Sequence, residues 1–561
     1  MIKSAQNREN NLLNMLDYLL PENGGRDYSI PKIHTQIPTR VGFDIFDYDM
    51  LFNDRETKKL IREGNTIGCF YIESPGMRSL LKRLDCDTFE MLTAASSVIR
   101  PGVAESGMMR EFIERHKKPE LRKYLVPEMK EHLGETYGVM IYQEDVIKVA
   151  HHVAGLTLEE SDLLRRAMSG KMRSHKAMES LSNKFFSSCE EKGYSKKIAL
   201  ELWRQIESFA GYAFNKAHSA SFALVSFQVA YLKTHYPAEF MASVLSNRGG
   251  YYSAAVYIQE SKRMGLQVLL PDVNRSEYEY YGVNNIVRIG LMAIKNLSQN
   301  SMDKIVKERK KNGKYVSLPD FLVRTKLAYE ETALLIKCGA MDSLAETRPT
   351  LMRLLDIYLS HRKLLDENSS DLFEFESYKL EEEIKTNVQY SIAEICRIEY
   401  ETLGYMVTRH PLEFFDKVLK RKDIIKSAAM NNYNGRTIKM AGWFMASKRI
   451  KTKKGEIMKF LSLEDLTGTF EAVIFPDTYR IFAEKTLSMG PYLLEGKVDM
   501  EDGHNLIVSK LAILSAKSFN AVTQWDSVEN KYYGDVEKVE EEEFEIVNSL
   551  GKENLRLAYA G

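Results

Sequence analysis

The 561-residue chain has few cysteines and no long apolar segment. These two features argue against several classes of protein. Its five cysteines include no Cys-x-x-Cys pair, which argues against a disulfide framework or a zinc finger and fits a reducing compartment. The longest apolar stretch, 222–232, is too short to span a bilayer, and the first ten residues, MIKSAQNREN, lack the apolar run of a secretory signal. We therefore expect a cytoplasmic protein with no membrane partner.

Charge is balanced over the whole chain but unevenly distributed along it. Lys and Arg number 78, as do Asp and Glu, and the length predicts three to four domains at ~150 residues each. Residues 161–235 contain 12 basic and 6 acidic residues, a net of +6, and residues 435–461 contain 8 and 1, a net of +7. Two separate basic segments suggest a partner with a long phosphate backbone, although two solvated surfaces would give the same counts.

Hydrophobic periodicity predicts a multidomain fold that is mostly α-helical and is followed by a small β-barrel. Residues 61–265 show helical spacing, residues 266–345 form shorter helices around loops, and residues 346–430 are charged and helical. Residues 435–514 show five alternating strands, with a Gly-bearing turn at 465–468 and a helical insert at 478–488. This pattern fits an OB-fold, and residues 515–561 form an acidic tail.

The first hairpin of the expected barrel is strongly basic. Barrels of this kind hold single strands through backbone charge and base stacking, so we expect its cations to contact phosphates. The neighbouring aromatics Trp443, Phe444 and Phe460 fit either a stacking surface or the barrel core. The cations around Gly455 are Lys448, Arg449, Lys451, Lys453 and Lys454.

Three segments of the helical part combine cations with glycine, at 99–102, 163–171 and 209–219. Arg165 and Arg166, followed by Lys171, place three cations near a helix end, while Lys216 and His218 precede a Ser- and Tyr-bearing helix. Arg can fork onto phosphate oxygens and Lys acts as a point charge. The pattern indicates a polyphosphate or nucleic-acid site, with a surface ion-pair network as the alternative.

These segments belong to longer ones that follow one another in a fixed order. They read GCFYIESPGMRSLLKRL, SSVIRPG, TYGVMIYQEDVIKVAHHVAGLTLEESDLLRRAMSGK, ESFAGYAFNKAHSASFALVSFQVAYLKTHYPAEFMASVL and LLPDVNRS. Over about residues 45 to 515 the chain resembles the alpha subunit of bacterial DNA polymerase III, the family C replicative polymerases. The resemblance implies a connector from the palm at 1–60, a fingers-like domain at 61–265, a helix-hairpin-helix and clamp-binding-like domain at 266–430 and an OB-fold at 435–514.

The resemblance also implies an activity and partners. It implies part of a DNA-directed DNA polymerase that binds an incoming dNTP, template–primer DNA, a sliding clamp and other replicase subunits. The residues that match the family's basic, RPG and YQE motifs are implied to contact nucleotide or phosphate. They are Arg100, Tyr142, Gln143, Arg165, Arg166, Lys171, Lys216 and His218.

The catalytic carboxylates of the family are not matched in this chain. In the family they lie on the palm and hold Mg²⁺, upstream of the fingers. Asp44, Asp47 and Asp49 stand where the family has a connector, so we expect capping or linker roles for them and assign no metal or catalytic residue. We therefore expect Mg²⁺ to be bound outside this chain and the chain alone not to extend a primer. The alternatives are a non-catalytic DNA-binding or clamp-tethering remnant and, more weakly, an RNA-binding OB protein.

Two further motifs depart from the family. The first hairpin of the helix-hairpin-helix region, 294–298, has Asn296 and Ser298 in place of a Gly-x-Gly turn, which would crowd an approaching phosphate. The second hairpin, 336–340, keeps Gly339 beside Lys337, so a DNA contact is expected there, with helix packing as the alternative. For the sliding clamp, Leu372 and Phe373 provide the two apolar anchors, whereas position 369, where the family has Gln, is a serine.

Overall fold

The structure is a computed structural model that describes most of the chain between residues 44 and 514. The described ranges are 44–99, 107–167, 175–210, 214–344, 346–364, 388–452, 454–500 and 504–514. Arg100, Lys171, Lys453, Leu372 and Phe373, which carry part of the sequence prediction, lie outside these ranges. The predicted contacts of these five residues therefore stay predictions.

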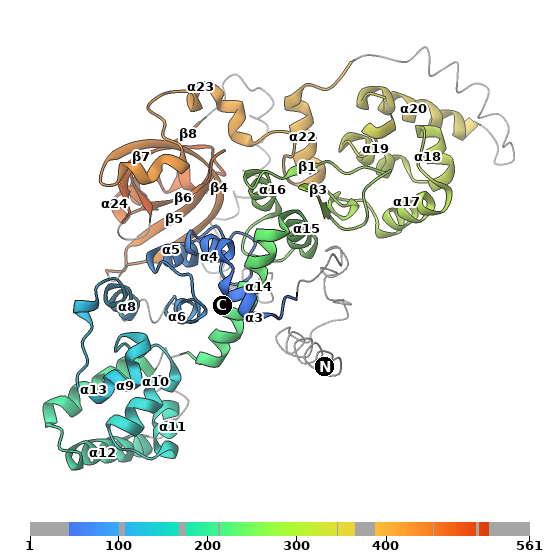
Figure 1. The fold of residues 1–561 in the computed structure, drawn as a ribbon. Helices are drawn as coiled ribbons and strands as arrows, with labels where there is room; N and C mark the ends of the chain where they lie inside the picture. The colour runs from blue at the N-terminus through green and yellow to red at the C-terminus, as the bar shows by residue number, and fades with distance from the viewer. Residues whose placement is uncertain are drawn as a thin grey trace.

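The first described helices form the base of the fingers-like region (Figure 1). Polar N-cap side chains mark where they begin: Asp54 accepts from the Thr57 amide, and Ser74 accepts from the Met77 amide. The base helices are α3 (Tyr48–Asn53), α4 (Arg55–Arg62), α5 (Pro75–Arg83), α6 (Phe89–Val98) and α8 (Met108–Lys117).

A second group of helices forms the finger tip, which Figure 1 shows at the lower left of the molecule. The start of α11 has a capping box, in which Thr157 and Glu160 each accept from the other's amide. The tip helices are α9 (Glu128–Leu133), α10 (Gln143–Lys148), α11 (Leu158–Arg166), α12 (His175–Glu191) and α13 (Lys196–Ala210).

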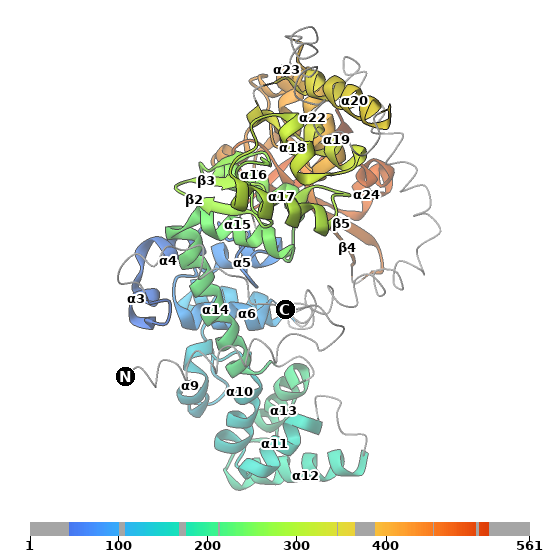
Figure 2. The same cartoon turned by 90° about the vertical axis from the view of Figure 1, so that its right-hand side faces the viewer.

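A long helix, α14 (Lys216–His235), runs from the finger tip to the base in both views (Figures 1 and 2). Its buried residues, such as Ala223 and Phe227, hold it among α3, α4 and α6. The chain then continues into α15 (Pro237–Asn247) and α16 (Ala254–Arg263). Because α14 begins at the tip and ends in the base, it connects the two groups of helices.

A small sheet and four helices form the next module, at the upper right of Figure 1. Strand β3 lies between β1, its parallel partner, and β2, its antiparallel partner. Helices α22 (Ile392–Leu403) and α23 (Asp416–Leu419) then lead to the barrel. The elements of the module are β1 (Gln267–Leu269), β2 (Tyr281–Val283), β3 (Ile286–Arg288), α17 (Gln299–Asn312), α18 (Leu318–Thr325), α19 (Tyr329–Lys337) and α20 (Arg348–Leu364).

Five strands close into a barrel with the neighbour order β4-β5-β6-β8-β7. The β6–β8 pair is parallel and the other pairs are antiparallel. The predicted turn at 465–468 joins β5 to β6, and the helical insert predicted at 478–488 overlaps α24 (Pro476–Phe482). The strands are β4 (Thr437–Lys451), β5 (Ile457–Glu464), β6 (Thr469–Ile474), β7 (Tyr492–Asp499) and β8 (Asn505–Ile513). Mostly helical modules followed by an OB-like barrel confirm the predicted fold class.

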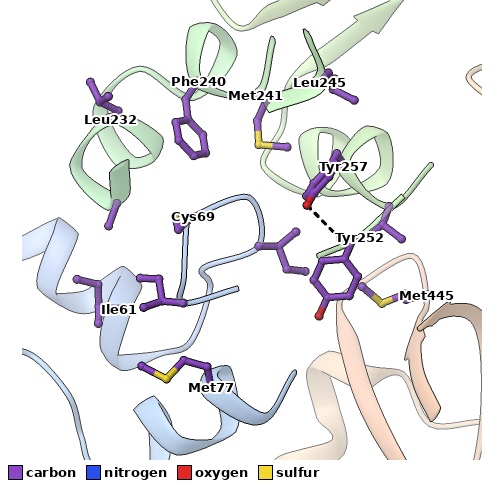
Figure 3. Packing of buried hydrophobic residues seen from close by; sticks show 14 of the residues in the cluster. Ile61, Cys69, Met77, Leu232, Phe240, Met241, Leu245, Tyr252, Tyr257 and Met445 are labelled. Atoms are coloured by element: carbon purple, nitrogen blue, oxygen red, sulfur yellow. Dashed lines mark hydrogen bonds between the residues drawn. The ribbon is translucent and has the colours of Figure 1, made fainter. Parts of the chain in front are cut away.

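The barrel packs against the base of the fingers-like region. Figure 3 shows Met445 of β4 beside Tyr252, at the edge of the apolar core that also contains Ile61, Met77 and Phe240. The core is therefore continuous from the base helices to the first barrel strand.

Buried charges accompany this apolar contact. Arg263 Nη1 of α16 lies 2.7 Å from Glu464 Oε2 of β5, and Arg263 Nη2 lies 3.2 Å from Glu260 Oε2. Glu260 Oε1 in turn accepts from Lys233 Nζ of α14 at 2.7 Å, and the Lys233 side chain is only 1% exposed. We call Lys233, Glu260, Arg263 and Glu464 the base network.

All five cysteines are buried and carry free thiols, and burial raises the pKa of Cys69 to about 12. None of the helices in the described part of the chain has the length and hydropathy needed to cross a membrane.

Candidate nucleotide and nucleic-acid interface

The start of α10 meets the start of α14 at the finger tip. Tyr142 and Phe214 form a parallel β-bridge, in which the Gln143 amide donates to the Phe214 carbonyl oxygen at 2.9 Å. The Asp145 carboxylate fixes the approach to α10, because its Oδ2 accepts from the amides of Ile141 and Tyr142, both at 3.0 Å. Two motifs that lie about 70 residues apart in the sequence, YQE and FNKAH, are thereby brought together.

Arg165, at the end of α11, joins this meeting point from a third segment. Its Nη1 donates to Gln143 Oε1 at 3.1 Å, while its Nε and Nη2 donate to Asp162 Oδ1 at 2.9 and 2.7 Å. Arg166 contacts the other oxygen of the same carboxylate, with Nη2 2.7 Å from Asp162 Oδ2, and its side chain is 61% exposed. Hydrogen bonds from Arg165 are the main reason that the pKa of Asp162 lies below its usual value.

Lys216 completes the group at the first residue of α14. Its Nζ lies 2.6 Å from Glu135 Oε1 and 5.2 Å from the centre of the Tyr142 ring. Its amide donates to Glu144 Oε2 at 3.0 Å, so a second acid holds the backbone here. Lys216 is therefore held on the same surface as Tyr142.

His218 lies two residues after Lys216 on α14, between two aromatic rings. Its ring centre is 5.0 Å from that of Phe214 and 4.4 Å from that of Phe222. The structure thus brings Tyr142, Gln143, Arg165 and Lys216 together, and Arg166 and His218 lie next to them on α11 and α14. We call these six residues the tip site.

The acidic residues of the tip site were not predicted from the sequence. Glu135, Glu144 and Asp162 each pair with a predicted cation or its backbone. Asp145 is 1% exposed, its Oδ1 has no hydrogen-bond partner in the described structure, and burial raises its pKa to about 7. Its place three residues after the helix-capping Tyr142 follows the capping-box spacing, which is the one signal in the sequence that could have found it.

The two hairpins of the helix-hairpin-helix module use their backbone groups internally. In the first, the Lys295 amide donates to the Thr402 carbonyl oxygen at 2.8 Å, and the Ser298 amide donates to Glu331 Oε1 at 3.0 Å. Asn296 adopts a φ of 64°, the left-handed conformation that glycine would otherwise supply. The amides of Lys295 and Ser298 therefore already have acceptors within the protein, in addition to the side-chain crowding predicted at this hairpin.

The second hairpin is filled by an arginine of its own module. Gly339 has a φ of +84°, and a Cβ placed there would meet the Arg348 guanidinium at 2.2 Å. Arg348 is 6% exposed, pairs with Asp342 at 2.7 Å and donates to the Lys337 carbonyl oxygen at 3.2 Å. The Lys337 side chain is exposed. The contact with Arg348 is compatible with helix packing, the alternative interpretation of this hairpin. A DNA contact of Lys337 and Gly339 stays a prediction.

The basic barrel hairpin lies at the far end of β4 and β5. Lys448, Arg449 and Lys451 are exposed on β4, and Lys454 is exposed in the turn. Trp443 and Phe460 are both half-buried. The two rings are therefore neither fully buried in the core nor fully open for base stacking.

Two of the three amino-terminal aspartates accept hydrogen bonds from nearby amides. Asp47 Oδ1 accepts from the Met50 amide at the start of α3, and Asp44 Oδ1 accepts from the Phe46 amide. Within the described ranges, no three His, Cys, Asp or Glu side chains gather so as to hold a metal ion. The described residues therefore do not fit a magnesium pair, and we assign them no metal-dependent step.

Comparisons with known proteins agree with the order of these modules. Residues 29–193 match the family model of the bacterial DNA polymerase III alpha subunit finger domain, and residues 265–351 match that of a helix-hairpin-helix motif. The DNA polymerase III subunit alpha of Borreliella burgdorferi is 35% identical over 473 residues, which cover 80% of this chain and 39% of that protein. The Bacillus subtilis protein of the same name is 33% identical, with 79% and 39% covered, and that of Staphylococcus aureus MRSA252 is 32% identical, with 87% and 45% covered.

The chain thus combines a match to a polymerase finger domain, a match to a helix-hairpin-helix motif and an OB-like barrel, in this order. The chain belongs to the family of the bacterial DNA polymerase III alpha subunit. It spans about two-fifths of the length of the curated relatives it matches.

Proposed function

We propose that the chain is the nucleotide- and DNA-holding part of a replicative DNA polymerase of the polymerase III alpha type. The observation that carries the proposal is the tip site, where Tyr142, Gln143, Arg165 and Lys216 converge from three segments. The cations of the site are paired with surface acids, and charge-assisted bonds to phosphate oxygens can replace such pairs. The tip site is therefore suited to the triphosphate of an incoming dNTP.

The other modules would hold DNA around this site. The barrel hairpin, with Lys448, Arg449, Lys451 and Lys454 exposed, suits the backbone of a single template strand. Leu372 and Phe373 are the proposed anchors for a sliding clamp. Mg²⁺ and other replicase subunits belong to the complete polymerase of the cytoplasm, and no described residue of this chain is assigned to either.

Nucleotide binding by an arginine variant tests the proposal. In Arg166→Ala, loss of a charge-assisted bond should weaken binding of a template-matched dNTP about tenfold, because such bonds contribute about 1.5–3 kcal/mol. Binding of the corresponding nucleoside, which has no phosphate, should not change. Both affinities would be measured by equilibrium dialysis of the full chain with a 3′-blocked primer–template.

Arg204→Ala is the matched control. Arg204 on α13 is 66% exposed and pairs with Glu201 three residues away, much as Arg166 pairs with Asp162. An equal loss of dNTP binding in the two variants, or no loss in either, would overturn the assignment of the tip site.

A further inference from the structure

Most amide donors of the two hairpins are engaged within the protein. Side chains, more than these amides, are therefore expected to meet DNA if the module binds it. A carboxylate occupies the start of α17, where Glu331 Oε1 accepts from the Ser298 amide at 3.0 Å and Glu331 Oε2 accepts from Ser301 Oγ at 2.7 Å. Burial opposes ionisation of Glu331, but these hydrogen bonds and nearby Lys304 lower its pKa overall. An ionised carboxylate at a helix start takes the place that a phosphate would need.

Helix α17 itself carries a basic surface that the sequence analysis did not single out. Residues 303–314 contain 6 basic and 2 acidic residues, a net of +4. Two of these cations serve the fold or a surface pair: Arg309 is buried and donates to the Val273 and Ser276 carbonyl oxygens, and Lys310 pairs with Glu277 at 2.8 Å. The other lysines of α17 are exposed.

Three of the exposed lysines share one face of the helix. Lys304, Lys307 and Lys311 follow the i, i+3, i+7 spacing, while the buried Met302 and Ile305 lie on the opposite face. Lys307 is 81% exposed and lies 4.0 Å from Asp303, a weak surface pair. Among the described residues, no ion pair engages Lys304 or Lys311. From Lys304 to Lys311 the helix rises about 10 Å, or about three base-pair steps of duplex DNA.

The position of α17 suits contact with DNA that also reaches the fingers. In both views α17 is the lowest of the four helices of its module, on the side nearer the finger helices (Figures 1 and 2). We propose that the face formed by Lys304, Lys307 and Lys311 holds the phosphate backbone of duplex DNA, a role that the engaged amides of the two hairpins do not fill. This inference rests on the proposed function, since it assumes that the chain binds duplex DNA.

The salt dependence of duplex binding tests the inference. Each phosphate contact contributes about 0.9 to the slope of log affinity against log salt, so replacing Lys304, Lys307 and Lys311 by Ala should reduce the slope by about 2.7. Affinity at low salt should fall at least about tenfold. A short blunt-ended duplex and the full chain would be used in a fluorescence anisotropy titration. The triple Lys→Arg variant keeps the charge and should retain the wild-type slope.

A second triple variant controls for net charge. Lys59, Lys196 and Lys197 are exposed on α4 and α13, and their replacement by Ala removes the same charge. An unchanged slope in the α17 variant, or an equal reduction in the control variant, would overturn the assignment to α17 while leaving DNA binding intact. Failure of the wild-type chain to bind the duplex at low salt would instead overturn the proposed function.

Discussion

Paired cations occur at both ends of α14, and the two ends differ in how deeply the pairs are buried. At the finger tip, Arg166 is 61% exposed and Lys216 is 38% exposed. At the base, Lys233 is 1% exposed and Arg263 is 12% exposed. Ion pairs of the same kind are therefore exposed to solvent near one end of α14 and buried near the other.

Burial decides what each group of cations can do. An exposed pair contributes little stability, about 0–1 kcal/mol, so its acid can be exchanged for a phosphate at small cost. A buried pair has already lost its hydration, and removal of one partner leaves an uncompensated charge. We infer that the tip site is adapted to exchange partners, whereas the base network fixes the barrel on the fingers-like region.

The largest expected effect comes from breaking the base network. Lys233 Nζ donates to the Asn65 and Ile67 carbonyl oxygens at 2.8 and 2.7 Å as well as to Glu260. Lys233→Met should lower the free energy of unfolding by about 3–5 kcal/mol, because a buried charge and two carbonyls lose their partner. The midpoint of urea unfolding would show the change.

A second substitution sharpens this test. Lys233→Met combined with Glu260→Gln removes both charges, so the double variant should recover part of the lost stability. Arg166→Ala at the tip should leave the midpoint nearly unchanged. A midpoint that is as sensitive to Arg166→Ala as to Lys233→Met would remove the distinction between the two ends of α14.

A smaller effect is expected from Asp145, a buried acid beside the tip site. The pKa of Asp145 is raised from its ordinary 3.8 to about 7, mainly by burial. Between these two values the folded state binds more protons than the unfolded state, so stability falls as pH rises from about 4 to about 7 and is level above. The loss is on the order of 2–4 kcal/mol at most.

Hydrogen exchange at two amides can follow this effect locally. Ile141 and Tyr142 donate to Asp145, so their protection factors should be lower at pH 8 than at pH 5.5–6. In Asp145→Asn, which has no titrating group at this position, the difference should disappear. The same difference in both proteins would show that Asp145 does not cause it.

Local patterns made the barrel and the motif segments predictable. Alternating strands and the turn at 465–468 depend on neighbouring residues, so the five strands and the turn could be expected from the sequence. The resemblance predicted that Tyr142 and Lys216 belong to one site, and the β-bridge between Tyr142 and Phe214 places the two motifs side by side.

Tertiary pairing was not predictable in the same way. Lys233 added to the basic count of residues 161–235, yet it is buried in the base network and contributes nothing to a surface. Glu135, and the Arg348 guanidinium against Gly339, come from positions that no local spacing connects with their partners. Asp162 differs, because it lies three and four residues before Arg165 and Arg166, a helical spacing that the sequence shows. Charge counts show how many cations a segment has, whereas burial decides which of them are available to a ligand.

Removing the acid that holds both tip arginines tests the central claim most directly. Asp162→Asn keeps the shape of the side chain but removes the charge that competes with phosphate for Arg165 and Arg166. If these arginines exchange partners, binding of a template-matched dNTP should become tighter by several-fold, or roughly 1 kcal/mol. An unchanged or weaker affinity in the same dialysis measurement would contradict the exchange of Asp162 for phosphate.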